Sequence, residues 1–139
     1  MAINTLEFRP DLGSLRPYKC NDVGGILPWR LYKQDTTDPK LCVLAQGGDH
    51  VLGLSLKKEK ASNDAGGLGT QADLCTAGNP LWVETAVAVN PGQPLTVAAD
   101  GKVKVRTTFD DDSEPLVGIA RSKTTGTGTE ILAFDPSFQ

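Results

Sequence analysis

The sequence feature that most constrains the fold is an Asp100-Gly101 dipeptide between two alternating apolar segments. An Asp-Gly pair readily takes the positive φ angles of a type I′ turn, the tight turn that joins adjacent antiparallel strands. Apolar residues alternate with polar ones on both sides of the dipeptide, at Leu95, Val97, Ala99, Val103 and Val105. We therefore predict a β-hairpin over 95–106, with its basic residues on the solvated face.

Short strands joined by frequent turns are predicted along the rest of the chain. The 139 residues include 15 glycines and 9 prolines, with little sustained helical periodicity, so the fold class is predicted to be all-β. Further strands are predicted at 26–35, 41–45, 51–56, 81–83, 86–89, 115–120 and 130–134. The length suits one domain, so we expect a small β-barrel or sandwich of about seven to nine short antiparallel strands over 26–139.

A weak internal repeat relates two of these segments. Residues 50–58 and 115–123 align without a gap at a spacing of 65 residues, and both contain an apolar-apolar-Gly-apolar pattern. Each copy follows a strand-like sequence, and with these sequences included the pseudo-repeat covers 29–58 and 95–123. Two such units would pack face to face as one barrel. Chance similarity is the alternative. If the repeat is genuine, Gly53 and Gly118 lie at barrel corners.

The first predicted strand alternates after Pro28. Alternation places Trp29 and Leu31 on one face and Arg30 and Tyr32 on the other.

An extended N-terminal arm is predicted over 1–25, where prolines and glycines interrupt scattered apolar residues. Such a segment buries few of its own apolar side chains, so it either wraps its own domain or adds to a neighbouring subunit. The apolar arm residues expected to make subunit contacts are Leu6, Phe8, Leu12 and Tyr18. A second segment, 61–69, is rich in small residues and is predicted to be a loop.

Charge and cysteine content exclude several classes of function. The net charge of −3 and the isoelectric point near 5.1 argue against binding to nucleic acid. No apolar run reaches membrane-spanning length and the N-terminus does not resemble a secretory signal, so we expect synthesis in the cytoplasm and no membrane partner. The three cysteines, Cys20, Cys42 and Cys75, are widely spaced and are expected to be reduced and buried, with a bridged pair as the minority alternative.

The residues that carry chemistry in other proteins are sparse here. His50 is the one histidine in the sequence, and its position after Gly47-Gly48-Asp49 predicts a surface turn. The acidic cluster 110–114 lacks the glycine and terminal glutamate of an EF-hand loop, so a solvated loop is expected in preference to a cation site. The glycine-rich segments lack the Lys-Ser/Thr of a phosphate loop. We expect no enzyme activity, no catalytic or metal-binding residues and no cofactor.

One enzymatic alternative follows from the segment Arg121-Ser-Lys-Thr-Thr-Gly-Thr-Gly-Thr129, which resembles the glycine-rich C-terminal motif of trimeric dUTP pyrophosphatases. The substrate and phosphate motifs of that family have no counterpart in the chain. A small trimeric β-fold hydrolase is therefore the lesser alternative.

About the last 60 residues of the chain contain three short motifs: Pro91-Gly-Gln-Pro-Leu, Asp100-Gly-Lys-Val103 and Leu116-Val-Gly-Ile-Ala120. In these motifs the C-terminal part of the chain resembles the capsid decoration, or cement, proteins of tailed bacteriophages. The resemblance implies a compact β-barrel that binds the outside of an assembled head as a homotrimer, with an arm that clamps neighbouring subunits of the major capsid protein. The protein would then be located in the virion, and in the host cytoplasm during assembly.

Two tryptophans are the remaining candidate contact residues. Under this resemblance Trp29 and Trp82 are possible interface anchors, and core packing is the alternative. A head fibre base or another surface-display module of the virion is the alternative to a decoration protein.

Overall fold

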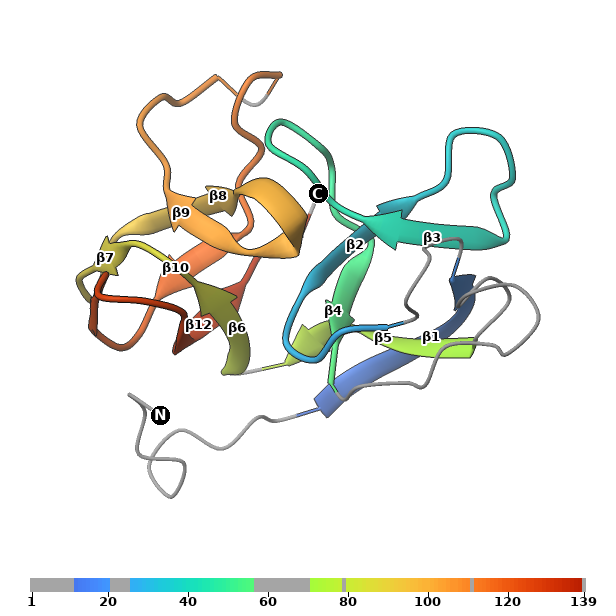
Figure 1. Ribbon diagram of the computed structural model, residues 1–139, viewed down its shortest axis with the longest axis horizontal. Coiled ribbons are helices and arrows are strands. Elements are labelled where there is room, and N and C mark those ends of the chain that lie inside the picture. The colour runs from blue at the N-terminus through green and yellow to red at the C-terminus, as the bar shows by residue number, and fades with distance from the viewer. Residues whose placement is uncertain (1–11, 21–25, 57–70, 79, 111, 139) are drawn as a thin grey trace.

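The chain folds into two β-barrels that lie side by side, one from each half of the sequence (Figure 1). The computed structural model describes residues 12–20, 26–56, 71–78, 80–110 and 112–138. Within these ranges the first barrel contains β1 (Leu12–Cys20), β2 (Leu31–Gln34), β3 (Leu41–Leu44), β4 (Gly53–Ser55) and β5 (Gln71–Gly78). The second contains β6 (Leu81–Thr85), β8 (Pro94–Val97), β9 (Val103–Val105), β10 (Gly118–Ala120) and β12 (Glu130–Pro136). The predicted all-β fold is confirmed.

Two smaller elements belong to the second half of the chain. Strands β7 (Ala88–Val89) and β11 (Thr124–Thr125) form a separate two-stranded antiparallel sheet. A 3₁₀ turn, η1 (Ala99–Gly101), connects β8 to β9.

The two barrels share one topology. The first has the strand order β1-β3-β2-β4-β5 and closes by pairing β5 with β1, and the second has the equivalent order β6-β9-β8-β10-β12. In each barrel the first strand runs parallel to the third, and the other pairs are antiparallel. The described halves therefore form a tandem repeat in which β1 corresponds to β6, β2 to β8, β3 to β9, β4 to β10 and β5 to β12.

This result corrects the expectation of one barrel built from two half-sized units. The repeat extends beyond 29–58 and 95–123, because each unit also contains an earlier and a later strand that close its own barrel. In the first barrel these are β1 and β5. Strand β1 lies inside the segment expected to be an arm over 1–25, and a β-bulge around Gly13 and the presence of Pro17 conceal it in the sequence.

The shared glycine of the repeat has a packing reason. A Cβ atom on Gly53 would lie 2.8 Å from the carbonyl oxygen of Cys75 in β5, and one on Gly118 would lie 2.2 Å from that of Asp135 in β12. In both barrels the fourth strand meets the last strand so closely that no side chain fits between them. The sequence repeat therefore reflects a repeated structure and not chance similarity. In each copy the glycine allows the backbones of two strands to approach closely.

The predicted hairpin is confirmed. Strands β8 and β9 pair with Leu95 opposite Val105 and Val97 opposite Val103. Asp100 and Gly101 both have positive φ angles, 58° and 75°, and the Lys102 amide donates to the Ala99 carbonyl at 3.4 Å. These are the angles that the Asp-Gly pair predicts.

Two hydrophobic clusters stabilise the barrels. The smaller lies in the first barrel, where its buried members are Cys20, Ile26, Tyr32, Cys42 and Leu74. The larger joins first-barrel residues such as Leu31 and Leu54 to the core of the second barrel around Phe134. The alternation predicted for this strand agrees with the packing: Leu31 and Tyr32 are both fully buried, and they belong to different clusters.

All three cysteines are buried, as expected. Among the described residues, no helical segment has the length and hydropathy of a membrane span. The predicted 61–69 loop, Leu6 and Phe8 lie outside the described residues.

Candidate interaction site

The two tryptophans predicted as anchors contact each other where the barrels meet. Their ring centroids lie 5.3 Å apart with a tilt of 57° between the rings. Trp29 comes from the segment before β2 in the first barrel, and Trp82 comes from β6 in the second; both side chains are half-buried. Their contact therefore helps hold the two barrels together. We call the region formed by Trp29–Leu31, Ala45, Trp82–Glu84 and 99–101 the joint.

Backbone hydrogen bonds fix the geometry of the joint. The Glu84 amide donates to the Trp29 carbonyl at 2.9 Å, and the Gly101 amide donates to the Ala45 carbonyl at 2.8 Å. Trp29 has a φ of 58°, a conformation that is uncommon for a bulky residue. Because Trp29 leaves the extended conformation, β2 begins at Leu31 and not at the start of the predicted strand.

An ion pair accompanies these bonds. The Arg30 guanidinium lies 2.8 Å from the Glu84 carboxylate through Nε and through Nη2, and its Nη1 donates to the Asp100 carbonyl at 2.9 Å. Both side chains of the pair are only 16% exposed. A guanidinium that bridges a carboxylate and a carbonyl restricts both the distance and the angle between the barrels.

We expect Glu84→Gln to lower the free energy of unfolding by about 1–2 kcal/mol, because the Arg30 guanidinium would keep its position and lose its charged partner. Urea unfolding followed by tryptophan fluorescence measures this loss. The matched control is Asp135→Asn, which breaks the exposed pair with Arg121 and should cost less than about 0.5 kcal/mol. Equal losses in the two variants would contradict a structural role for the joint.

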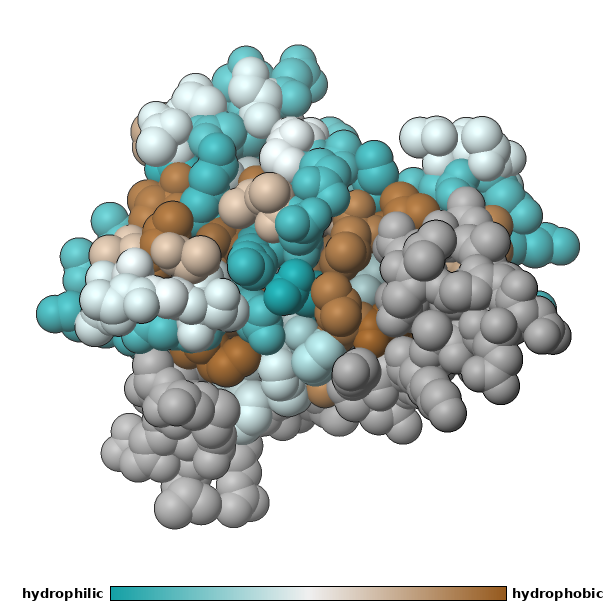
Figure 2. Space-filling view, in the orientation of Figure 1, coloured by the Kyte–Doolittle hydropathy of each residue, from teal (hydrophilic) through white to brown (hydrophobic). Residues whose placement is uncertain are grey.

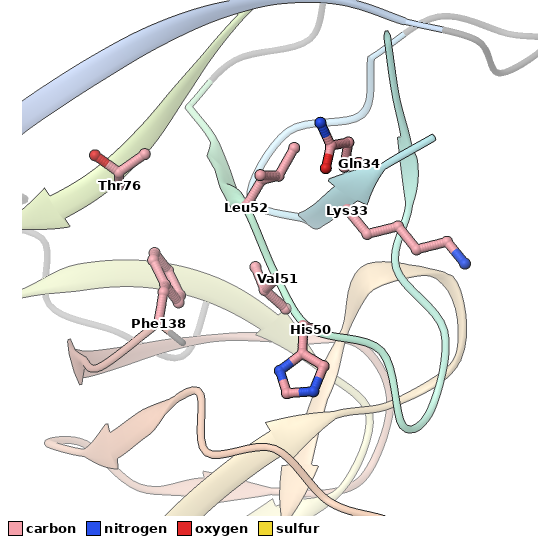
Figure 3. A pocket seen from close by; sticks show the side chains of 7 residues that line it. All are labelled: Lys33, Gln34, His50, Val51, Leu52, Thr76 and Phe138. Carbon is pink, nitrogen blue, oxygen red and sulfur yellow. The ribbon is translucent and has the colours of Figure 1, made fainter. Parts of the chain in front are cut away.

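A groove lies around the exposed His50 (Figure 3). It has a volume of about 410 Å³ and its described lining consists of Lys33, Gln34, His50, Val51, Leu52, Thr76 and Phe138. Lys33 extends away from His50 and pairs with Asp49 at 3.1 Å. The described lining offers no carboxylate to orient the imidazole of His50, so the groove resembles a binding surface more than a catalytic constellation.

The acidic cluster 110–114 forms part of a loop, which we call the Phe109 loop and define by its described residues, 106–110 and 112–114. The buried Glu114 carboxylate accepts from the amides of Thr107 and Thr108 at 2.8 and 2.7 Å, and it lies 3.8 Å from Lys104. The Asp110 carboxylate accepts from the Ser113 hydroxyl at 2.9 Å. The carboxylates of Glu114 and Asp110 therefore help to shape the loop.

The pKa of Glu114 is lowered from its ordinary value of 4.5, first by the Thr107 amide and then by further donors and Lys104. A lowered pKa in the folded state means that the carboxylate stabilises the fold fully above about pH 4.5 and loses that effect as the pH falls through the folded-state pKa. We expect the stability difference between the wild type and Glu114→Gln to be constant near neutral pH and to shrink below pH 4.5. Urea unfolding from pH 7 to pH 3 tests this; a difference independent of pH would contradict it.

Phe109 is the most exposed large apolar side chain among the described residues, at 88%. The loop projects from the second barrel after β9 (Figure 1) and lies within a largely hydrophilic region of the surface (Figure 2). Arg106 lies 5.7 Å from the Phe109 ring centre, and its Nε donates to the Glu114 carbonyl. Phe109 is not among the contact residues predicted from the sequence, where its only signal is one aromatic residue between two threonines and a run of aspartates.

The candidate contact residues fall into three groups. Leu6 and Phe8 lie outside the described residues. Leu12 and Tyr18 belong to β1, and Tyr18 packs against the first-barrel cluster, so these two are part of a barrel and not of a free arm. Trp29 and Trp82 lie in the joint.

Comparison with known proteins identifies a similar fold. No protein-family model and no curated protein sequence matches the chain. Among solved structures, the chain is similar to the head fiber gp8.5 N base of bacteriophage phi29, with a TM-score of 0.64 and 15% sequence identity. The similarity covers 89% of this chain and 93% of the phage chain. At this identity the match concerns the fold, which extends over both barrels.

Proposed function

We propose that this chain is a structural protein of a bacteriophage virion that attaches to the outer surface of the head. The observation that carries the proposal is the shared fold with a phage head fiber base over 89% of the chain. The motif resemblance to decoration proteins supports the same location from a different property, the sequence of the second barrel. Fold alone does not establish function, so the proposal depends on the agreement of these two observations.

The role within the head is proposed to be either the base of a head fibre or a decoration protein that clamps neighbouring major capsid subunits. The tandem fold suits both roles. Two barrels of one topology, held by the Arg30–Glu84 pair and the tryptophan contact, present related surfaces at a fixed separation. One chain can then bridge two neighbouring, chemically identical capsid subunits without reordering itself, which limits the entropic cost of binding.

Capsid binding is proposed to be selective for the assembled shell, with three copies at local three-fold positions. A ligand that binds only the assembled state stabilises that state by mass action. Leu6, Phe8, Leu12 and Tyr18 remain proposed capsid contacts, the last two from β1. Because Trp29 and Trp82 contact each other in the joint, their proposed contribution is to the rigidity of the barrel pair.

The proposal is tested with heads assembled in the absence of this chain. Purified chain should co-sediment with such heads at saturable stoichiometry and should not bind unassembled major capsid protein. Heads that carry the chain should withstand higher temperature before they release DNA. Chain that remains in the supernatant at every concentration would contradict the proposal.

A further inference from the structure

A groove on the first barrel corresponds to the joint on the second. It has a volume of about 520 Å³, and its described lining consists of Pro17, Tyr18, Lys19, Asp38, Lys40 and Leu41. We call it the β1 groove. The strand registers equate Cys20 with Thr85, because each is the parallel partner of the third strand, at Cys42 and at Val103. Lys19 on the first barrel therefore occupies the position of Glu84 on the second.

On the second barrel this position is filled by another part of the chain. The occupant is an aromatic residue followed by a charged one: Trp29 packs on Trp82, and Arg30 pairs with Glu84. In the β1 groove a lysine stands in place of the glutamate, and the same register places Pro17 at the position of Trp82, so an apolar residue two positions before a charged one recurs with the opposite charge. The occupant of this groove should therefore be an aromatic residue followed by an acidic one.

The Phe109 loop has this composition. Phe109 is followed directly by Asp110, Asp111 and Asp112, and its ring is 88% exposed. The groove offers apolar surface from Pro17, Tyr18 and Leu41, and its charged groups are Lys19, Lys40 and one aspartate, Asp38. The aspartates of the loop complement the lysines of the groove in charge. The exposed aromatic ring complements the apolar surface of the groove in polarity.

The loop is also pre-organised for binding. Glu114 accepts from the amides of Thr107 and Thr108, and Asp110 accepts from the Ser113 hydroxyl, so these described residues are held in place before the loop meets a partner. An ordered loop loses less conformational entropy on binding than a mobile one.

We propose that the chain self-associates head to tail, with the Phe109 loop of one copy seated in the β1 groove of the next. The contact is heterologous, since it joins two different surfaces, and it forms a closed ring when the rotation between copies closes. This inference does not depend on the proposed location in the virion.

The test is sedimentation equilibrium of the full chain over a wide concentration range. Wild type should show a mass that rises above 14.7 kDa with concentration. Phe109→Ser and Lys40→Glu should each weaken association by at least about tenfold. The matched controls Val87→Ser, at a 37% exposed apolar residue, and Lys123→Glu, at an exposed lysine, should associate as wild type does. Circular dichroism checks that each variant is folded.

Mixing distinguishes head-to-tail contact from other modes of association. Phe109→Ser retains an intact groove, and Lys40→Glu retains an intact loop. In an equimolar mixture the loop of Lys40→Glu can therefore occupy the groove of Phe109→Ser. The mixture should form a dimer of twice the chain mass, which neither variant forms alone. A mixture that stays at the chain mass would overturn the proposal. So would a wild type that is monomeric up to about 1 mM, the limit of a weak specific contact, or association that Phe109→Ser leaves unchanged.

Discussion

Gly118→Ala is expected to destabilise the chain by about 3 kcal/mol or more, toward the upper end of the overpacking range. The added Cβ atom would lie 2.2 Å from the Asp135 carbonyl oxygen and 2.8 Å from Cδ2 of Phe134. The first contact is with backbone, so relief requires β10 and β12 to separate, which would weaken the hydrogen bonds that pair them. Urea unfolding at neutral pH measures the loss.

The matched control is Gly47→Ala. Its added Cβ atom would have one neighbour, the Val97 carbonyl at 4.0 Å, and the residue lies in a turn without a positive φ angle. We expect a change within about 0.5 kcal/mol, as for surface substitutions in general. Similar stability for the two variants would contradict the close approach of β10 and β12.

Phe134→Ala is expected to lower the free energy of unfolding by about 3–5 kcal/mol, the usual cost of removing a fully buried phenylalanine. The cluster around Phe134 includes Leu31 and Leu54 of the first barrel, so the two barrels should unfold together. The three buried cysteines all belong to the first barrel and can report this directly. Their labelling by a thiol reagent should accelerate at least about 100-fold in Phe134→Ala, since each 1.4 kcal/mol is a factor of ten.

The control is Val87→Ala, at a 37% exposed residue of the same barrel, which should leave cysteine labelling unchanged. If Phe134→Ala destabilises the chain but the cysteines remain as protected as in wild type, the barrels open independently. That result would contradict the role of the joint as a rigid connection.

The fold could be predicted from sequence where local signals are strong. Alternation around Asp100-Gly101 predicts the β8–β9 hairpin because turn chemistry and strand periodicity agree there. The shared glycine pattern at Gly53 and Gly118 marks corresponding strands, because the same backbone contact recurs in both barrels. These signals lie within short segments of the chain.

The closing strands of the first barrel could not be predicted in this way. Strand β1 contains a proline and a bulge, and β5 has few β-branched or aromatic residues, so neither shows regular alternation. Their strand conformation depends on pairing with each other across more than 50 residues of sequence, as between Lys19 and Gln71. The number of barrels therefore follows from tertiary pairing.

The joint and the Phe109 loop depend on tertiary structure in the same way. Arg30 and Glu84 are 54 residues apart, and nothing local connects them. The sequence indicates only that Trp29 is an aromatic residue suited to a core or an interface. Its contact with Trp82 depends on its positive φ angle and on the position of the second barrel, which are features of the tertiary structure. Phe109 is exposed in a loop where Glu114 is buried and accepts from the Thr108 amide, although the charge of Glu114 alone predicts a solvated residue.

Quantitative mass spectrometry of virus particles purified from the source of the chain tests the proposed place on a phage head most directly. The measured quantity is the ratio of this chain to the major capsid protein. We predict a reproducible ratio, near one or one to a few for a decoration protein and lower for a fibre base. A ratio near zero, no greater than that of contaminating host proteins, would contradict a place on the phage head.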